Sequence, residues 1–370
     1  MTTRREAILV TGGTGYVGCL VLSVLLRETD ADLILPVRGA RSPDDLRALV
    51  RGHLALEGHD AGAVDFGRLV VTPLPATGRM DDLAAADGGR EIREVVHTAG
   101  CSDYQDAAAC EAANVGLTAA LLAAAKRMGV GRFVHISTMF CSGLTDGVIP
   151  ERLHPPGRPQ PIHYTETKRR AEWLVAESGI PFVIVRPSVV VGHSRAGWYR
   201  GKPFGMYQVN AVVERTLCAE YLPVLHLLST PNPLPFLHQD AFQLGFSAIR
   251  RRAPDGAVVH LVSRAETLPR MEEFWKTWIE EVLRPREVRT FRSLEEAAGL
   301  DAPHRTLYAM AGINIGIAAR PWRPETTTID RLRGEIPDFP DVTPESFRNL
   351  QRRAFAESAA VQAFRERFAR

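Results

Sequence analysis

The sequence of 370 residues is poor in cysteine, lacks long apolar runs and has no marked excess of charge of either sign. Its five cysteines are odd in number and scattered, so they form neither a disulfide framework nor a zinc-binding pattern. We expect them to be small core residues of a protein of the reducing cytoplasm. A net charge of +2 gives no basic field of the kind that binds nucleic acid, so no nucleic-acid partner is expected.

No segment has the pattern of a membrane anchor or of a metal site. The start, residues 1–6, is short and charged, unlike a signal peptide. The apolar stretch at 217–238 is interrupted by prolines, and the one at 310–319 is too short to span a bilayer. The eleven histidines show no His-Glu-x-x-His spacing. We therefore expect no transmembrane segment and no bound metal.

Apolar runs and amphipathic segments alternate along the first half of the chain. Residues 7–10 have the aliphatic pattern of a buried parallel strand, and apolar residues recur at helical spacing in 114–128. Further strands are expected at 33–37, 94–98, 132–137 and 181–185, with helices ending near 27 and covering 164–178. This alternation predicts an α/β fold, a Rossmann-type doubly wound parallel sheet with helices on both faces.

Three glycines, at positions 12, 15 and 18, follow the first strand in the pattern Gly-x-x-Gly-x-x-Gly. Glycine at a strand end permits a tight turn, and its missing side chain lets a pyrophosphate approach the backbone. The helix that follows presents N–H donors and a positive dipole to the phosphates. Because the pattern lies between a strand and a helix near the start of the chain, it predicts a dinucleotide site.

The regular alternation fades after residue 192. We therefore divide the chain into an NAD(P)-binding Rossmann core, 1–192, and a mainly substrate-binding lobe, 193–370, with some strands returning to the core. A returning strand is expected at 257–262, and 272–283 and 344–367 have helical patterns. The aromatic and proline-rich stretch 198–236 suggests an apolar pocket, although such residues often simply pack a loop-rich lobe.

Arg38 stands at the end of the second strand, twenty residues after Gly18, with Arg41 close behind. An acidic residue at that place would bind the adenosine ribose hydroxyls of NAD and repel a 2′-phosphate. A guanidinium instead pairs with a phosphate through two hydrogen bonds. Arg38 therefore favours NADPH as the cofactor, while NADH and an exposed arginine in a solvated loop remain the alternatives.

Tyr164 and Lys168 are four residues apart, which places them on one face of a helix. A nearby ammonium, together with an oxidised nicotinamide, is expected to lower the pKa of the phenol. Tyr164 can then give a proton to a carbonyl oxygen as hydride reaches the carbon. A hydroxyl at the end of the strand 132–137 can donate to the same oxygen, and the spacing admits either Ser137 or Thr138.

Taken in order, these motifs resemble those of the extended short-chain dehydrogenase/reductases, and within them the thioester reductase and fatty acyl-CoA reductase branch. The resemblance covers about residues 7–200. It is carried by residues 11–18, Val37-Arg38-Gly39-Ala40, His97-Thr98-Ala99-Gly100, Asn114-Val115-Gly116, His135-Ile136-Ser137-Thr138, Tyr164–Lys168 and 185–192. One departure is Val71-Thr72-Pro73-Leu74, where the family usually has Gly-Asp beside the adenine.

The resemblance implies a set of site residues. The catalytic set is Thr138, Tyr164 and Lys168. The cofactor-binding set is Gly12, Thr14, Gly15, Tyr16, Val17, Gly18, Arg38, Thr98, Ala99, Gly100, Tyr164, Lys168, Pro187 and Ser188, with Asn114 on the helix beneath the site.

The same resemblance favours reduction of a carbonyl on a lipophilic substrate by NADPH, with an acyl thioester, bound to CoA or to a carrier protein, giving an aldehyde. Three other functions use the same fold. They are a ketone or alcohol oxidoreductase of specialised metabolism, an NAD-dependent sugar epimerase and a non-catalytic cofactor-binding protein. The presence of both Tyr164 and Lys168 argues against the last, and Arg38 argues against the epimerase.

Replacing Arg38 with aspartate tests the cofactor prediction. The variant should weaken NADPH binding far more than NADH binding, because a carboxylate repels the 2′-phosphate. Titration of both cofactors measures this, with NADH as the internal control. Equal effects on the two cofactors would mean that the 2′-phosphate is not recognised at this position.

Overall fold

The computed structural model describes residues 5–39, 42–85, 88–145 and 147–368, which form two compact units. The first unit comprises Met1–Ser188, Phe242–Leu261 and Pro324–Phe339. The second comprises Val189–Ala241, Val262–Arg323 and Pro340–Arg370. The chain therefore passes through the first unit three times.

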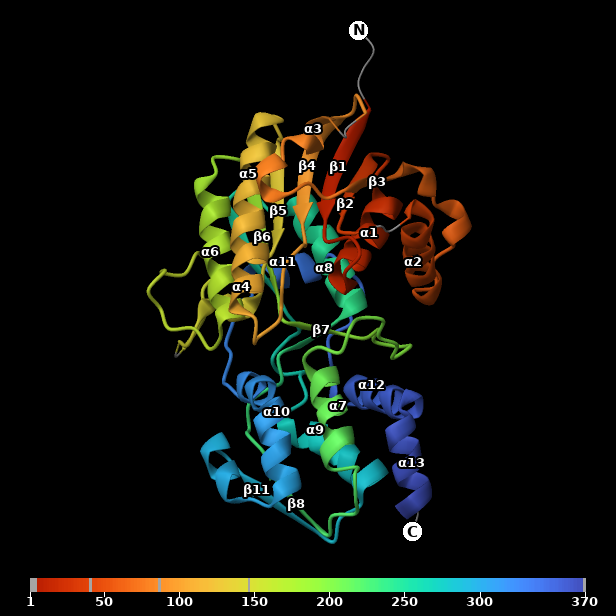
Figure 1. Cartoon of the computed structure of the whole chain (residues 1–370), viewed down its shortest axis with the longest axis vertical. Coiled ribbons are helices and arrows are strands. Elements are labelled where there is room, and N and C mark those ends of the chain that lie inside the picture. Colours follow the sequence, from red (N-terminus) through yellow and green to blue (C-terminus); the bar gives the residue numbers. More distant parts are fainter. Residues whose placement is uncertain (1–4, 40–41, 86–87, 146, 369–370) are drawn as a thin grey trace. The chain divides into compact units, whose positions relative to one another are not determined.

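A seven-stranded parallel sheet forms the centre of the first unit (Figure 1). The strands lie in the order β10-β6-β5-β4-β1-β2-β3, and every neighbouring pair is parallel. Their bounds are β1 Glu6–Thr11, β2 Asp32–Val37, β3 Leu69–Pro73, β4 Glu91–His97, β5 Arg132–Ile136, β6 Phe182–Pro187 and β10 Ala257–Leu261. The chain order reverses between β1 and β4, the place where open sheets of this kind bind ligands. The predicted doubly wound parallel fold is confirmed.

Helices flank the sheet, with α5 and α6 over one face (Figure 1). Apolar side chains from alternate strand positions, among them Leu9, Val95 and Phe133, share one core with Leu121 of α5 and Val175 of α6. The helices of this part of the chain are α1 Tyr16–Glu28, α2 Pro43–Leu56, α3 Asp82–Ala85, α4 Ala107–Cys110, α5 Leu117–Arg127, α6 His163–Glu177, α8 Gln239–Arg252 and α11 Thr327–Arg333.

The face of the sheet beneath α5 and α6 becomes polar at the carboxyl ends of its strands. Alternate residues of a strand share a face, so the residue two positions after each apolar one points the same way. These polar residues are Thr11 on β1, His97 on β4, His135 on β5, Arg186 on β6 and His260 on β10, all buried. Buried polar groups need partners, and these lie at the edge where ligands bind.

The helix expected at 114–128 begins earlier. α4 continues through a π-helical turn, Glu111–Gly116, into α5. By length and composition alone, Ala107–Arg127 is long and apolar enough to cross a membrane, and no other helix in the described part of the chain passes that test. Leu121, Leu122 and Ala125 of this run belong to the core over the sheet, and 33% of its apolar window is buried.

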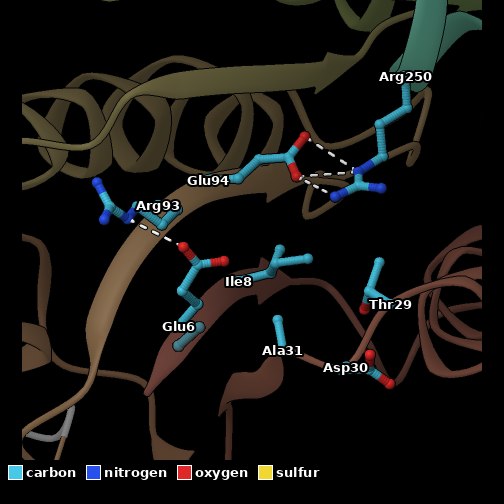
Figure 2. Close-up of a pocket in the computed structure, with 9 residues that line it drawn as sticks. Glu6, Ile8, Thr29, Asp30, Ala31, Arg93, Glu94 and Arg250 are labelled. Carbon is cyan, nitrogen blue, oxygen red and sulfur yellow. Dashed lines mark hydrogen bonds and ion pairs between the residues drawn. The ribbon is translucent and has the colours of Figure 1, made fainter. Parts of the chain in front are cut away.

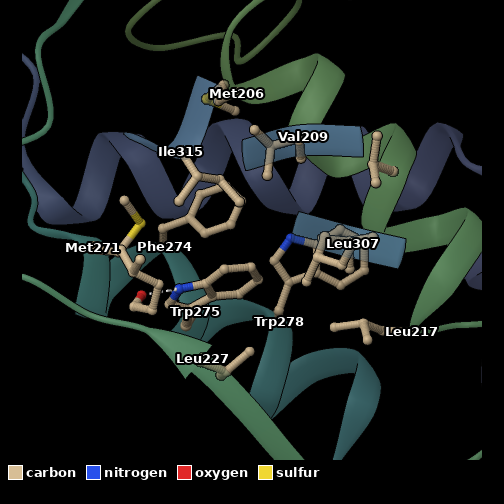
Figure 3. Close-up of a cluster of buried hydrophobic side chains, with 14 of the residues drawn as sticks. Met206, Val209, Leu217, Leu227, Met271, Phe274, Trp275, Trp278, Leu307 and Ile315 are labelled. Atoms are coloured by element: carbon tan, nitrogen blue, oxygen red, sulfur yellow. Dashed lines mark hydrogen bonds between the residues drawn. The ribbon is translucent and has the colours of Figure 1, made fainter. Parts of the chain in front are cut away.

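The second unit has a core of its own, rich in aromatic side chains (Figure 3). Trp275 and Trp278 on α9 are buried together, and their indole N–H groups donate to Leu228 O at 2.8 Å and Asn210 Oδ1 at 3.1 Å. Its elements are β7 Val189–Val191, α7 Met206–Thr216, β8 Val224–Leu228, β9 Phe236–His238, α9 Met271–Trp278, β11 Glu287–Phe291, α10 Ala302–Ala318, α12 Pro344–Glu357 and α13 Ala359–Phe368.

The helix expected at 344–367 is two helices, α12 and α13. Ser358 separates them in an extended conformation, with φ −89° and ψ 113°. Its hydroxyl accepts a hydrogen bond from Val361 N at 3.2 Å, so the serine ends one helix and caps the next.

A buried ion pair fastens α6 to β6. Arg186 donates from Nε to Glu172 Oε1 at 2.9 Å and from Nη2 to Glu172 Oε2 at 2.6 Å, and both side chains are fully buried. His154 Nε2 lies 2.8 Å from Arg186 Nη1. Because α6 carries Tyr164 and Lys168, this pair helps to fix the helix that holds both predicted site residues.

Glu172→Gln should lower the free energy of unfolding by about 3–5 kcal/mol, because it leaves the Arg186 charge buried without its counter-charge. The matched control is Glu111→Gln, since Glu111 pairs with Arg170 on the same helix but both are about half exposed. The control should change stability by about 1 kcal/mol or less. Urea unfolding of the two variants measures the difference, and equal losses would contradict this account.

Candidate functional site

The turn between β1 and α1 presents bare backbone at the carboxyl edge of the sheet. Gly12 has a φ of +76°, and a Cβ there would lie 2.5 Å from the backbone nitrogen of Ala99. A Cβ at Gly18 would overlap the carbonyl oxygen of Gly12. α1 begins at Tyr16 with no side-chain cap and no acidic residue in its first turn. The positive end of the helix dipole therefore meets no acidic side chain in this turn, which suits an anion such as a pyrophosphate.

The other predicted cofactor residues surround the same edge. Thr14 and Val17 are half-buried in the glycine turn. Thr98, Ala99 and Gly100 follow β4, and Thr98 Oγ1 donates to the Thr11 carbonyl at 2.7 Å. Pro187 ends β6, and the next residue, Ser188, has a buried hydroxyl with no hydrogen-bond partner within the described ranges. Such a hydroxyl is suited to a polar ligand.

Arg38 follows directly after β2 and is exposed. The strand lies beside β1, so the guanidinium starts from the strand next to the glycine turn. Arg41 lies outside the described residues. The segment Val71–Leu74, where the sequence departs from the family pattern, lies beside the end of β2. Val71–Pro73 pairs with that strand, and Leu74 N donates to the Val37 carbonyl at 2.8 Å.

Asn114 connects the loop after β4 to α6. Its side-chain oxygen accepts from Cys101 N at 2.9 Å, and its amide donates to Cys101 O at 3.0 Å and to Thr167 Oγ1 at 2.9 Å. A Cβ on Gly100 would lie 2.7 Å from this oxygen. The π-helical turn that contains Asn114 is the kind of irregularity often found at functional sites.

Tyr164 and Lys168 lie on the first two turns of α6, facing the end of β5. Lys168 Nζ donates to the Ile136 carbonyl at 2.7 Å. The Thr138 side chain acts on the Tyr164 phenol and lowers its pKa, whereas Ser137 acts on Cys141 and Glu172. Thr138 is therefore the hydroxyl beside the phenol, whereas the buried Ser137 oxygen has no hydrogen-bond partner within the described residues.

The pKa of Tyr164 shifts in the direction opposite to the expectation from sequence. Burial of the phenol raises it, and nearby thiols, Cys141 first, raise it further. The phenol is therefore held in its protonated form, as a proton donor requires. Burial also lowers the pKa of the Lys168 ammonium to about 8, with Glu172 opposing that shift.

Three residues near the site were not assigned a role from sequence. Tyr104 packs against Tyr164 with the ring centroids 5.9 Å apart. His97 and His135 stack at 5.3 Å beneath Lys168. The sequence did contain a signal for the histidine pair, because a histidine lies near the end of each of two buried strands. Such positions come together when the strands are neighbours in a parallel sheet, as His97 and His135 do here.

A separate hollow lies at the amino ends of β1 and β4 (Figure 2). Both of its arginines are paired with a carboxylate of the lining: Glu94 accepts from Arg250 Nε at 2.9 Å, and Arg93 lies 3.5 Å from Glu6. It is lined by Glu6, Ala7, Ile8, Thr29, Asp30, Ala31, Arg93, Glu94 and Arg250. Because both arginines are ion-paired and the lining contains no predicted site residue, we assign no chemistry to this hollow.

Residues 8–230 match the NAD dependent epimerase/dehydratase family. The chain belongs to this family. The matched range includes the glycine turn, Tyr164 and Lys168, and the resemblance to extended short-chain dehydrogenase/reductases is confirmed.

The relatives of this epimerase/dehydratase family member include a much longer protein and domains of larger proteins. The isonitrile lipopeptide synthase of Streptomyces coeruleorubidus is 30% identical over 287 residues, which cover 75% of this chain and 18% of that protein. The terminal R domain of the myxalamid PKS-NRPS pathway has a TM-score of 0.73 at 21% identity, covering 96% of this chain and 92% of that one. An archaeal thiolation-reductase di-domain has a TM-score of 0.69 at 16% identity, covering 95% and 75%.

The two structural likenesses show a shared fold, and they extend over both units of this family member. The chain spans less than two thirds of the length of the curated relatives that it matches. The activity and the substrates of those larger proteins are therefore not carried over by likeness alone.

The pKa of Lys168 gives a testable pH dependence for cofactor binding. Lys168 is an ammonium below about pH 8 and an amine above it. We expect NADPH to bind about tenfold more weakly well above that pH, since a charge-assisted hydrogen bond to the ribose is lost. Fluorescence titration across this range measures the effect. In Lys168→Met binding should be weak and flat with pH, and a wild-type profile that is also flat would contradict the role of Lys168.

Proposed function

We propose that this protein reduces an acyl thioester to an aldehyde, with NADPH as the preferred reductant. The observation that carries the proposal is that Thr138 lies beside the Tyr164 phenol and the buried Lys168 donates to the end of β5, at the sheet edge that holds the glycine turn. This arrangement can bind a carbonyl oxygen, protonate it and hold a dinucleotide beside it.

The choice of a thioester rests on the relatives. They are a lipopeptide synthase, the terminal R domain of a PKS-NRPS biosynthetic pathway, and an archaeal non-ribosomal peptide synthetase structure that joins a thiolation domain to a reductase domain. For this chain we infer a lipophilic acyl group carried on CoA or on a carrier protein. We also propose NADPH over NADH from the exposed Arg38, and a cytoplasmic location from the scattered free cysteines.

The chain's own residues have separate tasks in this proposal. Gly12, Gly15 and Gly18, with the start of α1, hold the pyrophosphate, and Ser188 offers its buried hydroxyl near the end of β6. Lys168 would donate to the nicotinamide ribose. The cofactor, when bound, would supply the hydride that reduces the thioester carbon.

Tyr164 and Thr138 act on the substrate oxygen. Both hydroxyls donate to the thioester oxygen, and they stabilise the negative charge that develops as the carbon becomes tetrahedral. Tyr164 transfers its proton to that oxygen, which is consistent with a phenol kept protonated by burial. The carbon–sulfur bond then breaks, and the products are an aldehyde and a free thiol, at the cost of one NADPH and one proton.

Tyr164→Phe should reduce turnover by about two to four orders of magnitude while NADPH binding stays nearly intact, because the general acid is lost and the ring is kept. The control is Tyr221→Phe, because Tyr221 belongs to the second unit and to neither predicted set of site residues, and its hydroxyl donates to Arg284 O at 3.4 Å. The control should retain normal turnover. Near-normal turnover in Tyr164→Phe would remove that residue from the mechanism.

The reaction itself is tested by following NADPH absorbance and thiol release together. The substrates are a panel of long-chain acyl-CoAs, lipophilic ketones and sugar nucleotides. The proposal predicts NADPH oxidation matched one to one by free CoA. Oxidation with ketones alone, without thiol, would instead establish a ketone reductase, and turnover of a sugar nucleotide without net oxidation would establish an epimerase.

A further inference from the structure

His135, near the carboxyl end of β5, lies directly beneath the amine of Lys168. Its Nε2 is 3.5 Å from Lys168 Nζ, at the long end of hydrogen-bonding distance, while the Ile136 carbonyl accepts from the same amine at 2.7 Å. The side chains of His135 and Lys168 are both buried. The imidazole and the carbonyl therefore occupy two of the three hydrogen-bonding directions of the amine.

The neighbouring His97 has one fixed tautomer. Thr118 Oγ1 donates its proton to the Asn114 carbonyl at 2.6 Å, so it accepts from Nε2 of His97 at 2.9 Å. Nδ1 of His97 then accepts from Thr11 Oγ1 at 2.6 Å. Both ring nitrogens are satisfied, and burial lowers the pKa of His97 to about 3, so the ring is neutral with its proton on Nε2.

The tautomer of His135 is not fixed by hydrogen bonds in this way. Its Nδ1 is buried and has no hydrogen-bond partner in the part of the chain that the structure describes. Burial lowers the pKa of His135 well below its ordinary value, and the Lys168 charge lowers it further, so this ring is also neutral. A neutral imidazole carries one proton on either nitrogen. The partner at Nε2 decides which, because an ammonium can only donate and an amine can accept.

We propose that His135 is a positioning residue for Lys168, and that its tautomer follows the protonation state of the lysine. While Lys168 is an ammonium, Nε2 of His135 accepts its hydrogen bond and the ring proton lies on Nδ1. Once Lys168 is an amine, the ring proton lies on Nε2 and is donated to the amine. One proton in total leaves the pair for solvent, and no bond between heavy atoms changes.

Other titratable groups lie near Lys168 on the surrounding elements, and their protonation states affect its titration. They are Glu172 on α6, Cys141 after β5, His135 on β5 and His97 on β4. Glu172 is ion-paired with Arg186, and burial raises the pKa of Cys141, so it stays a thiol. Of these groups Lys168 is the one that titrates near neutral pH, with a pKa of about 8.

The inference rests on the proposed function only for the task of Lys168 in catalysis, because the tautomer exchange is a property of the protein without cofactor or substrate. The test is nitrogen NMR of protein labelled with ¹⁵N-histidine, from about pH 6.5 to about pH 9.5. Signals of His135 are assigned by their loss in His135→Gln. The ring proton of His135 should lie on Nδ1 at low pH and on Nε2 at high pH, and the midpoint of this change should be near pH 8. His97 is the internal control and should keep its proton on Nε2 throughout.

The same NMR titration is repeated on Lys168→Met, because this variant lacks the titrating partner of His135. The pH-dependent exchange at His135 should disappear in this variant. An exchange that persists without the lysine, or a wild-type His135 with one tautomer at every pH, would overturn the proposal.

The functional consequence is measured with His135→Gln and His135→Leu. The glutamine oxygen can still accept from the ammonium, so the midpoint of the pH dependence of NADPH binding should stay near that of the wild type. Leucine cannot accept, so the midpoint should fall by about one pH unit, because the charged lysine loses a partner. Equal midpoints in the two variants would overturn the positioning role. A protein with the tautomer exchange that releases no thiol from acyl-CoA would refute the proposed function alone.

Discussion

The buried ammonium of Lys168 is the constraint on which the rest of the site depends. A cation with almost no exposed surface needs partners for its hydrogen bonds and counter-charge nearby. The Ile136 carbonyl and the His135 ring meet the first need, and Glu172 on the same helix provides the charge. Glu172 is itself held by Arg186 of β6. The lysine position is therefore determined by two neighbouring strands and one helix.

The same constraint explains why the sheet edge is polar. The sheet face beneath α5 and α6 is apolar in its middle and polar at its carboxyl ends, where the lysine, the histidine pair and the arginine meet. A row of buried polar side chains is stable only when nearly every one of them has a hydrogen-bond partner. Nδ1 of His135 and the hydroxyls of Ser137 and Ser188 are among the buried groups that have no hydrogen-bond partner in the described residues, and all three lie at the edge where we place the cofactor and its lysine.

The sequence was sufficient for the parts of the site that are local. The glycine turn and the Tyr-x-x-x-Lys spacing depend on residues within one turn or one helix, so their pattern predicts their geometry. The choice between Ser137 and Thr138 depends on which way each side chain points, and only the structure places Thr138 beside the phenol. The predicted direction of the Tyr164 pKa was wrong because burial of the phenol and the neighbouring thiols raise that pKa, and burial is not visible in a spacing.

The long-range parts could not be predicted. Glu172 and Arg186 are charged residues in ordinary positions until β6 and α6 are brought together. His97 and His135 are 38 positions apart and meet only through strand pairing. The break at Ser358 follows from one hydroxyl that caps the second helix, which periodicity alone does not reveal.

The measurement that tests the central claim most directly is the fate of the hydride. NADPH carrying deuterium at the transferred position is incubated with an acyl-CoA, and the products are examined by mass spectrometry. The account predicts an aldehyde with one deuterium on its carbonyl carbon, together with an equal amount of free CoA. Deuterium that stays on the cofactor, or that appears in a product still bound to sulfur, would contradict it.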